Sequence, residues 1–201
     1  MYKIIGHPQS RVLRVMWLLE ELGAPYELEP APPQSDPVRA VNPSGKIPVL
    51  LTDGAVLTDS VAICTYLADK HGKFTFPAGT LERARQDACT QFGVDVLEGA
   101  LWTSAKNSFV HPENVRVPAI KDVCRAEFAR GLETLATLLG DGPYLIGETF
   151  TIADIVVGHC SGWAAVAKFD LPKDGPVHDY FKRLRERPAF QATMARIKEA
   201  L

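Results

Sequence analysis

The run from Asn42 to Leu50, NPSGKIPVL, constrains the fold of this chain more than any other feature. Two prolines and a glycine interrupt it, and the apolar residues from Val49 onward predict a short buried strand. Because proline has no N–H, Pro48 fits only where a strand begins or where no neighbour needs that donor. With a cis bond before Pro48 the chain turns sharply, and the N–H and C=O of Ile47 face outward. An extended peptide can then pair with Ile47 as a short added strand.

A second feature lies downstream, where a short apolar run ends at Asp59 and Ser60. The residues that follow repeat at helical spacing, so these two residues mark the start of a helix. A helix start carries free N–H groups that favour an anion, and the Ser60 hydroxyl adds another donor. Together, Ile47 and Ser60 predict a docking site for a small acidic peptide.

Length and composition limit the classes of function. The 201 residues fit one large domain or two small ones, and the net charge of −2 favours neither nucleic acid nor an anionic membrane as a partner. No apolar run is long enough to span a bilayer, and the N-terminal residues MYKIIGHPQS lack the apolar core of a signal peptide. We therefore expect a cytoplasmic protein. The four cysteines are widely spaced and the five histidines show no ligand spacing, so we expect reduced thiols and no metal site.

The first part of the chain alternates between strand and helix patterns. Ser10 is suited to begin a helix that ends before Gly23, and Asp53-Gly54 is a hairpin signal. The order β-α-β, irregular segment, β-β-α predicts a small mixed sheet covered by helices. The expected strands are 2–5, 25–29, 49 onward and 55–57, the helices are 10–22 and 59–70, and the proline-rich segment 30–37 is irregular.

Residues 71–80 have no period and mark a domain boundary, after which the pattern is helical throughout. Thr151 with Asp154 forms a capping-box pattern, and Pro188 fits the first turn of a last helix. We expect five helices packed as a bundle, with a loop at 107–118.

These residues resemble the glutathione transferase family over nearly the whole chain. One motif would be weak evidence, but five occur in the family's order. They are SRVLRVMWLLEELG at 10–23, NPSGKIPVL at 42–50, which matches the cis-proline motif, DSVAI at 59–63, TIAD at 151–154 and RPAF at 187–190.

The resemblance implies an α/β domain followed by an all-α domain. Residues 1–75 would form a thioredoxin-like domain with a mixed four-stranded sheet, and residues 81–201 an all-helical domain, usually in a homodimer. Glutathione would be the co-substrate, with no other cofactor. Carried over by position, the glutathione-binding residues would be Ile47 and Pro48 for the cysteinyl part, Asp59 and Ser60 for the γ-glutamyl end, and Lys46 and Gln34 near the glycyl end.

The reaction implied by the resemblance is attack of the glutathione sulfur on a small electrophile. Only about 3% of a thiol with pKa ~8.5 is ionised at neutral pH, so the site must favour the thiolate. Ser10, at the start of the first helix, would donate a hydrogen bond to it and is our catalytic candidate, although an ungapped count back from Gly23 falls nearer Gln9. The alternative for Ser10 is a helix cap, and Arg11 is either a helper or a solvated cation. The absence of cysteine between His7 and Val15 argues against the thiol-transfer branch of the superfamily.

Three alternatives stay open for function: conjugation of glutathione to electrophiles, a glutathione-dependent peroxidase or isomerase reaction, and a non-catalytic glutathione-binding module. Trp102, Phe109 and Trp163 would line a pocket for a hydrophobic electrophile between the domains, but aromatic residues at helical spacing more often belong to a core.

Overall fold

The computed structural model describes residues 1–200, which group into two compact units. The first unit contains Met1–Pro77 and the chain from Arg185 on, and the second contains Ala78–Leu184. The contacts therefore group the last helix with the N-terminal residues. The division into two domains, residues 1–75 and residues 81–201, stays a prediction.

The first unit is built on a four-stranded mixed sheet, as the sequence predicts. Its order is β2-β1-β3-β4, with β1 parallel to β2 and antiparallel to β3, and β3 antiparallel to β4. The hairpin between β3 and β4 turns at Asp53 and Gly54. Both residues have positive φ, as a type I′ turn requires. The strands are β1 Tyr2–Ile5, β2 Tyr26–Glu29, β3 Val49–Thr52 and β4 Ala55–Thr58.

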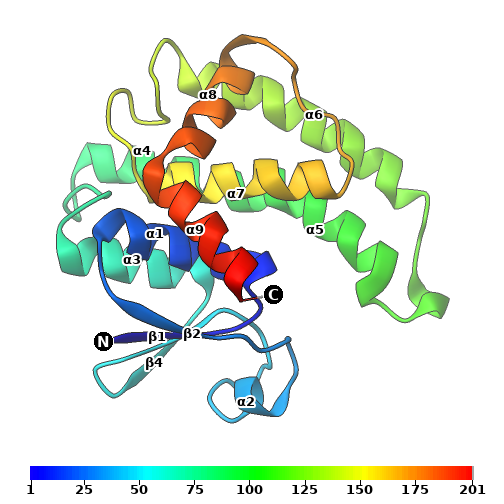
Figure 1. The fold of residues 1–201 in the computed structure, drawn as a ribbon. Coiled ribbons are helices and arrows are strands. Elements are labelled where there is room, and N and C mark those ends of the chain that lie inside the picture. Colours follow the sequence, from blue (N-terminus) through cyan, green and yellow to red (C-terminus); the bar gives the residue numbers. More distant parts are fainter. Residues whose placement is uncertain (201) are drawn as a thin grey trace. The chain divides into compact units, whose positions relative to one another are not determined.

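Helices cover both faces of this sheet (Figure 1). Helices α1 (Leu13–Leu22) and α3 (Ser60–His71) pack together on one face. On the other face, the short helix α2 (Asp36–Arg39) places Val38 in a buried cluster with Ile5 of β1 and Val49 of β3. This division follows from the alternation of side chains along a strand, which points Ile5 and its neighbour Ile4 in opposite directions. The sequence did not predict α2, because it begins within the proline-rich segment 30–37 and has only four residues.

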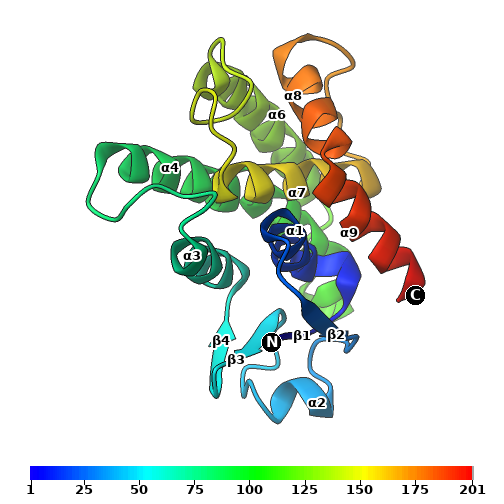
Figure 2. The same cartoon turned by 60° about the vertical axis from the view of Figure 1, so that its left-hand side comes forward.

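The C-terminal helix α9 (Pro188–Glu199) lies alongside α1 (Figure 2). Arg187, just before α9, donates two hydrogen bonds to the Glu21 carboxylate, with N–O distances of 2.6 and 2.7 Å. Arg196 pairs with Glu20 at 2.9 Å. The rings of Trp17 and Phe190 meet edge to face, with centroids 4.8 Å apart. Apolar contact and paired charges thus both hold α9 on α1.

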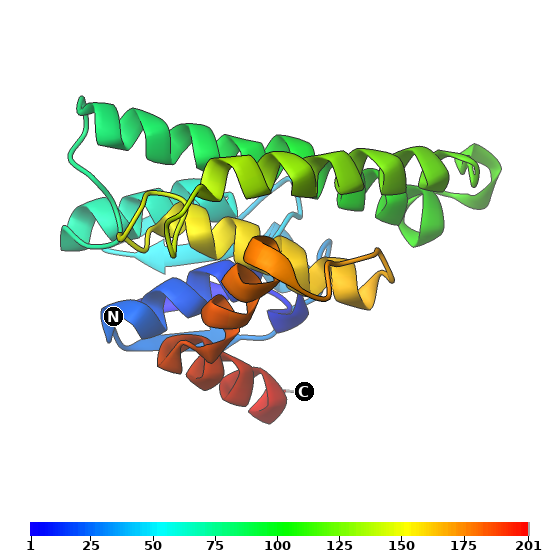
Figure 3. The same ribbon diagram turned by 90° about the horizontal axis from the view of Figure 1, so that it is seen from above.

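The second unit is helical (Figure 3). The chain is helical without a break from Leu81 to Ala105 but passes through a π-helical stretch, Gly93–Glu98. The predicted loop at 107–118 starts later, because helical backbone continues to Val110. Helix α6 packs against α5, and α7 packs against α4. The other elements are α4 Leu81–Phe92, α5 Gly99–Ala105, a π-helical turn Lys106–Val110, a 3-10 turn Glu113–Val115, α6 Ile120–Leu139, α7 Ile152–Val166 and α8 Gly175–Glu186.

The start of α7 confirms the predicted capping box. The Thr151 hydroxyl accepts from the N–H of Ala153 at 3.3 Å, and Asp154 accepts from the N–H of Thr151 at 2.8 Å. The buried Asp154 carboxylate also accepts from the Leu145 N–H at 3.0 Å and from the Tyr180 hydroxyl at 2.9 Å. One aspartate therefore joins α7, the preceding loop and α8. None of the helices within residues 1–200 is both long and apolar enough to cross a membrane.

Replacing the two members of this capping box should give unequal losses of stability. Thr151→Ala should lower the free energy of unfolding by about 1 kcal/mol, because one N–H loses its cap. Asp154→Ala should lower it by about 3 kcal/mol, because the buried Leu145 N–H and Tyr180 hydroxyl lose their acceptor. Urea unfolding monitored by circular dichroism measures both. Equal losses in the two variants would contradict this account.

Candidate functional site

The register of the sheet brings the predicted site residues to one end of the first unit. Val49, the first residue of β3, pairs with Ile5, the last residue of β1, and with Thr58, the last residue of β4. The residues next to these three in the chain are Gly6, Pro48 and Asp59. Segments that are far apart in the sequence therefore meet at this sheet end.

The segment before β3 presents an unpaired piece of main chain. The Ile47–Pro48 peptide bond is cis. The Asn42 side chain folds the preceding turn, since its amide donates to the Lys46 carbonyl at 2.8 Å and its oxygen accepts from Ser44. Ile47 is half-buried, and its N–H and C=O form no hydrogen bond within residues 1–200. This leaves the donor and acceptor that the sequence predicts for pairing with a peptide.

Gly6 sets the spacing between Ile47 and the start of the first helix. It has a φ of +146°, and a Cβ atom there would lie 2.7 Å from Cγ2 of Val12 and 2.9 Å from Cβ of Ile47. Such distances are far below van der Waals contact. Only glycine allows these two segments to approach so closely.

Asp59 and Ser60 form the start of α3, as predicted. Asp59 has a φ of +71°, an unusual value for a residue with a side chain and one found preferentially at functional sites. Its Oδ1 accepts from the N–H groups of Val61 at 2.8 Å and Ala62 at 3.1 Å. In the described chain, the N–H of Ser60 donates to no protein group and the second Asp59 oxygen accepts from none. The helix start thus keeps one donor and one anionic oxygen for a ligand.

Arg14 is a site residue that the sequence reasoning missed. It lies in α1 with only 1% of its surface exposed, and its Nη1 donates to the Ser60 hydroxyl at 3.2 Å. Burial raises the pKa of the nearby Cys64 thiol to about 12, against the opposing charge of Arg14. The available signal was a charged residue at the head of the apolar run Val15–Leu19.

Ser10, the catalytic candidate, uses its hydroxyl within the protein. The hydroxyl donates to the His7 carbonyl at 2.6 Å and accepts from the Val12 N–H at 3.2 Å. The predicted cap therefore forms within the turn Pro8–Val12, one turn before α1 begins at Leu13. A role for Ser10 at a sulfur stays a prediction. The neighbouring alternative, Gln9, is exposed.

Gln34 is held by protein groups. Its amide donates to the Ser44 carbonyl at 3.0 Å, and its side-chain oxygen accepts from Arg39. Arg39 also donates from Nε to the Gln34 carbonyl at 3.1 Å, which places a cation of α2 beside this turn. Lys46 is exposed, and no group in residues 1–200 pairs with its amine. Lys46 and Arg39 are therefore cations on this side of the site, and a role for Gln34 at a glycyl carboxylate stays a prediction.

Comparison with protein-family models decides the family. The model for the glutathione S-transferase N-terminal domain matches residues 10–70, and the model for the glutathione S-transferase C-terminal domain matches residues 84–186. The chain belongs to the glutathione S-transferase family.

Individual relatives are moderately similar to this glutathione S-transferase chain. Glutathione S-transferase GstA of Escherichia coli O157:H7 is 28% identical over 160 residues, which cover 78% of this chain and 76% of GstA. The crystal structure of a glutathione transferase from Methylococcus capsulatus is 28% identical, with a TM-score of 0.84 over 99% of this chain and all of that one. Glutathione transferase URE2P6 of Phanerochaete chrysosporium, in complex with oxidized glutathione, is 26% identical, with a TM-score of 0.85 over 100% of this chain and 97% of that one.

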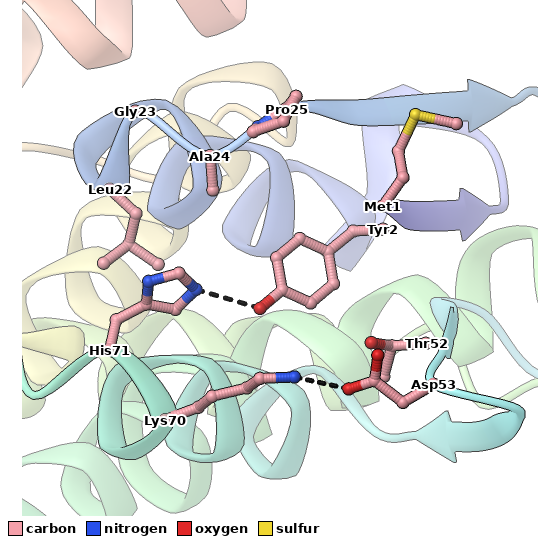
Figure 4. Close-up of a pocket in the computed structure, with 10 residues that line it drawn as sticks. All are labelled: Met1, Tyr2, Leu22, Gly23, Ala24, Pro25, Thr52, Asp53, Lys70 and His71. Atoms are coloured by element: carbon pink, nitrogen blue, oxygen red, sulfur yellow. Dashed lines mark hydrogen bonds and ion pairs between the residues drawn. The ribbon is translucent and has the colours of Figure 1, made fainter.

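A separate hollow of about 370 Å³ lies at the opposite end of the first unit of this family member (Figure 4). It is formed where α1 and α3 end, roughly 15 Å from the start of α1 at 1.5 Å per residue. Inside it, the Tyr2 hydroxyl lies 2.9 Å from Nε2 of His71, and Lys70 donates to Asp53. The hydrogen bond with Asp53 raises the pKa of Lys70. The polar groups of the hollow thus pair with one another, and none of the predicted site residues lines it.

The three aromatic candidates of the second unit differ in their surroundings. Trp102 and Trp163 are half-buried and meet edge to face, with centroids 6.2 Å apart. Phe109 is 70% exposed. Their role in an electrophile pocket stays a prediction. Among residues 1–200, no cluster of His, Cys, Asp or Glu has the arrangement of a metal site.

Gly6→Ala should destabilise this glutathione S-transferase more than Gly23→Ala. The new methyl group at Gly6 would overlap Val12 and Ile47, which adds ~1 to 3 kcal/mol of overpacking to the backbone cost. At Gly23, where φ is +64° and no atom lies within 4 Å, only a backbone cost of ~1 kcal/mol applies. Urea unfolding of both variants measures the difference, and similar losses would show that the close approach at Gly6 is not needed.

Proposed function

We propose that this protein is a glutathione transferase that conjugates the glutathione thiolate to small hydrophobic electrophiles. The observation that carries the proposal is the unpaired main chain of Ile47 beside the open N–H of Ser60 at one end of the sheet. An extended tripeptide with an anionic end has the groups to satisfy both. The family membership and the oxidized glutathione held by URE2P6 support glutathione as that tripeptide.

Each part of glutathione finds a chemically suitable partner in this site. Ile47, followed by the buried Pro48, would pair with the cysteinyl N–H and C=O as in a short strand. The γ-glutamyl carboxylate would accept from the Ser60 N–H and hydroxyl, and the ammonium would lie near the unpaired Asp59 oxygen. The glycyl carboxylate would lie toward Lys46, with Arg39 as the second cation of that side.

The chemistry requires the thiol to ionise near neutral pH. Lowering its pKa by about 2 units takes about 2.7 kcal/mol of differential stabilisation of the thiolate. A hydroxyl donor contributes ~1 to 2 kcal/mol, and more toward a charged acceptor. Ser10 is our candidate donor. To act, its hydroxyl must turn from the His7 carbonyl toward the sulfur, because a hydroxyl carries a single proton.

A second candidate function is glutathione binding without catalysis. The specific observation that favours it is the hydrogen bond from Ser10 to His7, which occupies the proton needed for the thiolate. The two candidate functions predict different rates of turnover but the same affinity for glutathione. For both, the resemblance leads us to expect a homodimer in the cytoplasm, which light scattering and cell fractionation test.

Ser10→Ala should lower the rate of conjugation of glutathione to an aryl halide by a factor of ten or more. The reason is the lost hydrogen bond to the thiolate, which should also raise the pKa of bound glutathione, read from the ultraviolet absorbance of the thiolate. Ser10→Thr keeps the hydroxyl and serves as the matched control. If the wild type binds glutathione but shows no turnover with any electrophile, the binding module is correct.

Asp59→Ala and Ser60→Ala should each weaken glutathione binding by about 1 to 3 kcal/mol, because each removes a charge-assisted hydrogen bond. Isothermal titration calorimetry measures the affinity. The exposed carboxylate of Glu27, on β2, provides a control in which Glu27→Ala leaves the affinity unchanged. Unchanged affinity in both site variants would show that glutathione does not use the start of α3.

A further inference from the structure

Arg14 is a buried cation that links α1 to the start of α3. Its guanidinium is taken out of water in a helix whose next five residues are also buried. Burying a charged group is costly unless hydrogen bonds compensate for the lost water. The hydrogen bond from Nη1 to the Ser60 hydroxyl, at 3.2 Å, joins α1 to the first residue of α3.

This hydrogen bond fixes the direction in which Ser60 can donate. A serine hydroxyl has one proton and two acceptor positions, whereas a guanidinium has donors only. Since Arg14 occupies one lone pair, the Ser60 proton must point elsewhere, and no group in residues 1–200 accepts it. Ser60 is 1% exposed, so this is a buried donor without an acceptor. A charged donor on its oxygen also strengthens the hydroxyl as a donor.

Charges of opposite sign lie on the two sides of Ser60. Arg14 contacts it from within α1, and Asp59 precedes it with one oxygen that accepts from no protein group. Since Arg14 contacts Ser60 and Asp59 caps α3, both charges lie at the first turn of α3. A ligand end that carries a carboxylate and an ammonium on one carbon matches this pair of charges.

We propose that Arg14 is a positioning residue that, through Ser60, makes the site select tripeptides that carry the α-carboxylate of the γ-glutamyl group. This inference rests on the proposed glutathione site and adds its source of selectivity. Arg14 does not touch the ligand. It holds the Ser60 hydroxyl in the orientation that donates to the carboxylate, and its charge strengthens that hydroxyl as a donor.

Two ligands separate this role from a structural one. Glutathione carries the α-carboxylate, and 4-aminobutyryl-cysteinyl-glycine is the same tripeptide without it. By calorimetry, the wild type should bind glutathione at least ~30-fold more tightly than the analogue, as expected when a site built for a charged group is left unpaired. Arg14→Met should weaken glutathione binding at least ~10-fold and change analogue binding less than ~2-fold.

Three further variants control for stability and coupling. Arg14→Lys keeps the charge and should recover part of the preference for glutathione. Cys64→Ala alters a buried residue one turn along α3 and should leave the preference unchanged even if the protein melts earlier. The double variant of Arg14→Met and Ser60→Ala should bind glutathione within ~2-fold of Ser60→Ala alone, because residues that act through one another are not additive.

The outcomes are distinct. The inference is overturned if Arg14→Met weakens the binding of both tripeptides equally, or if the two substitutions act independently in the double variant. Either result would assign Arg14 to folding alone, while the proposed glutathione site would stand. A wild type that binds neither tripeptide would overturn the proposed function and this inference together. If Arg14→Met does not fold, Arg14→Lys decides, because its preference for glutathione must fall below that of the wild type once the guanidinium donor to Ser60 is lost.

Discussion

The burial of helix α1 is the constraint on which the first unit depends. Six consecutive residues, Arg14–Leu19, are buried, whereas a helix at a protein surface alternates between buried and exposed positions. The surrounding elements are α3 and α9, which pack against it, and the sheet. Because α1 is enclosed, its first turn has little freedom, and Gly6 and Arg14 connect that turn to Ile47 and Ser60. The geometry of the site is therefore a consequence of packing.

Groups left unused by the protein define what the site can bind. Four groups have no hydrogen-bond partner within residues 1–200: the main chain of Ile47, the N–H of Ser60, the proton of the Ser60 hydroxyl and one oxygen of Asp59. Polar groups near a protein interior are normally satisfied, so open ones at a single sheet end indicate a ligand. By the same criterion, the hollow of Figure 4 is a weaker candidate for a ligand site. Lys70 pairs with Asp53 there, and the Tyr2 hydroxyl pairs with His71. Family membership supports glutathione as the proposed ligand, and the open groups are donors and acceptors that suit it.

Local signals in the sequence predicted most of the fold. Glycine and proline positions gave the strand ends and the hairpin, and Thr151 with Asp154 gave the start of α7, since each of these features acts over a few residues. Contacts between segments far apart in the sequence could not be predicted from such local signals. The pairing of Arg187 with Glu21 spans 166 residues, and nothing local in either residue indicates its partner. The same limit explains why Arg14 was missed, because its partner Ser60 lies 46 residues away in the sequence.

The composition of the first unit has a consequence for synthesis on the ribosome. Its sheet and first helices end at Pro77, but its last helix begins after Arg185, so 107 residues separate the two pieces. At roughly 5 to 20 residues per second, the N-terminal piece waits about 5 to 20 seconds for α9. During that time Trp17 lacks the ring of Phe190, and the Glu21 carboxylate lacks Arg187. Until α9 is made, the side of α1 that packs against it, including the Trp17 ring, is therefore uncovered.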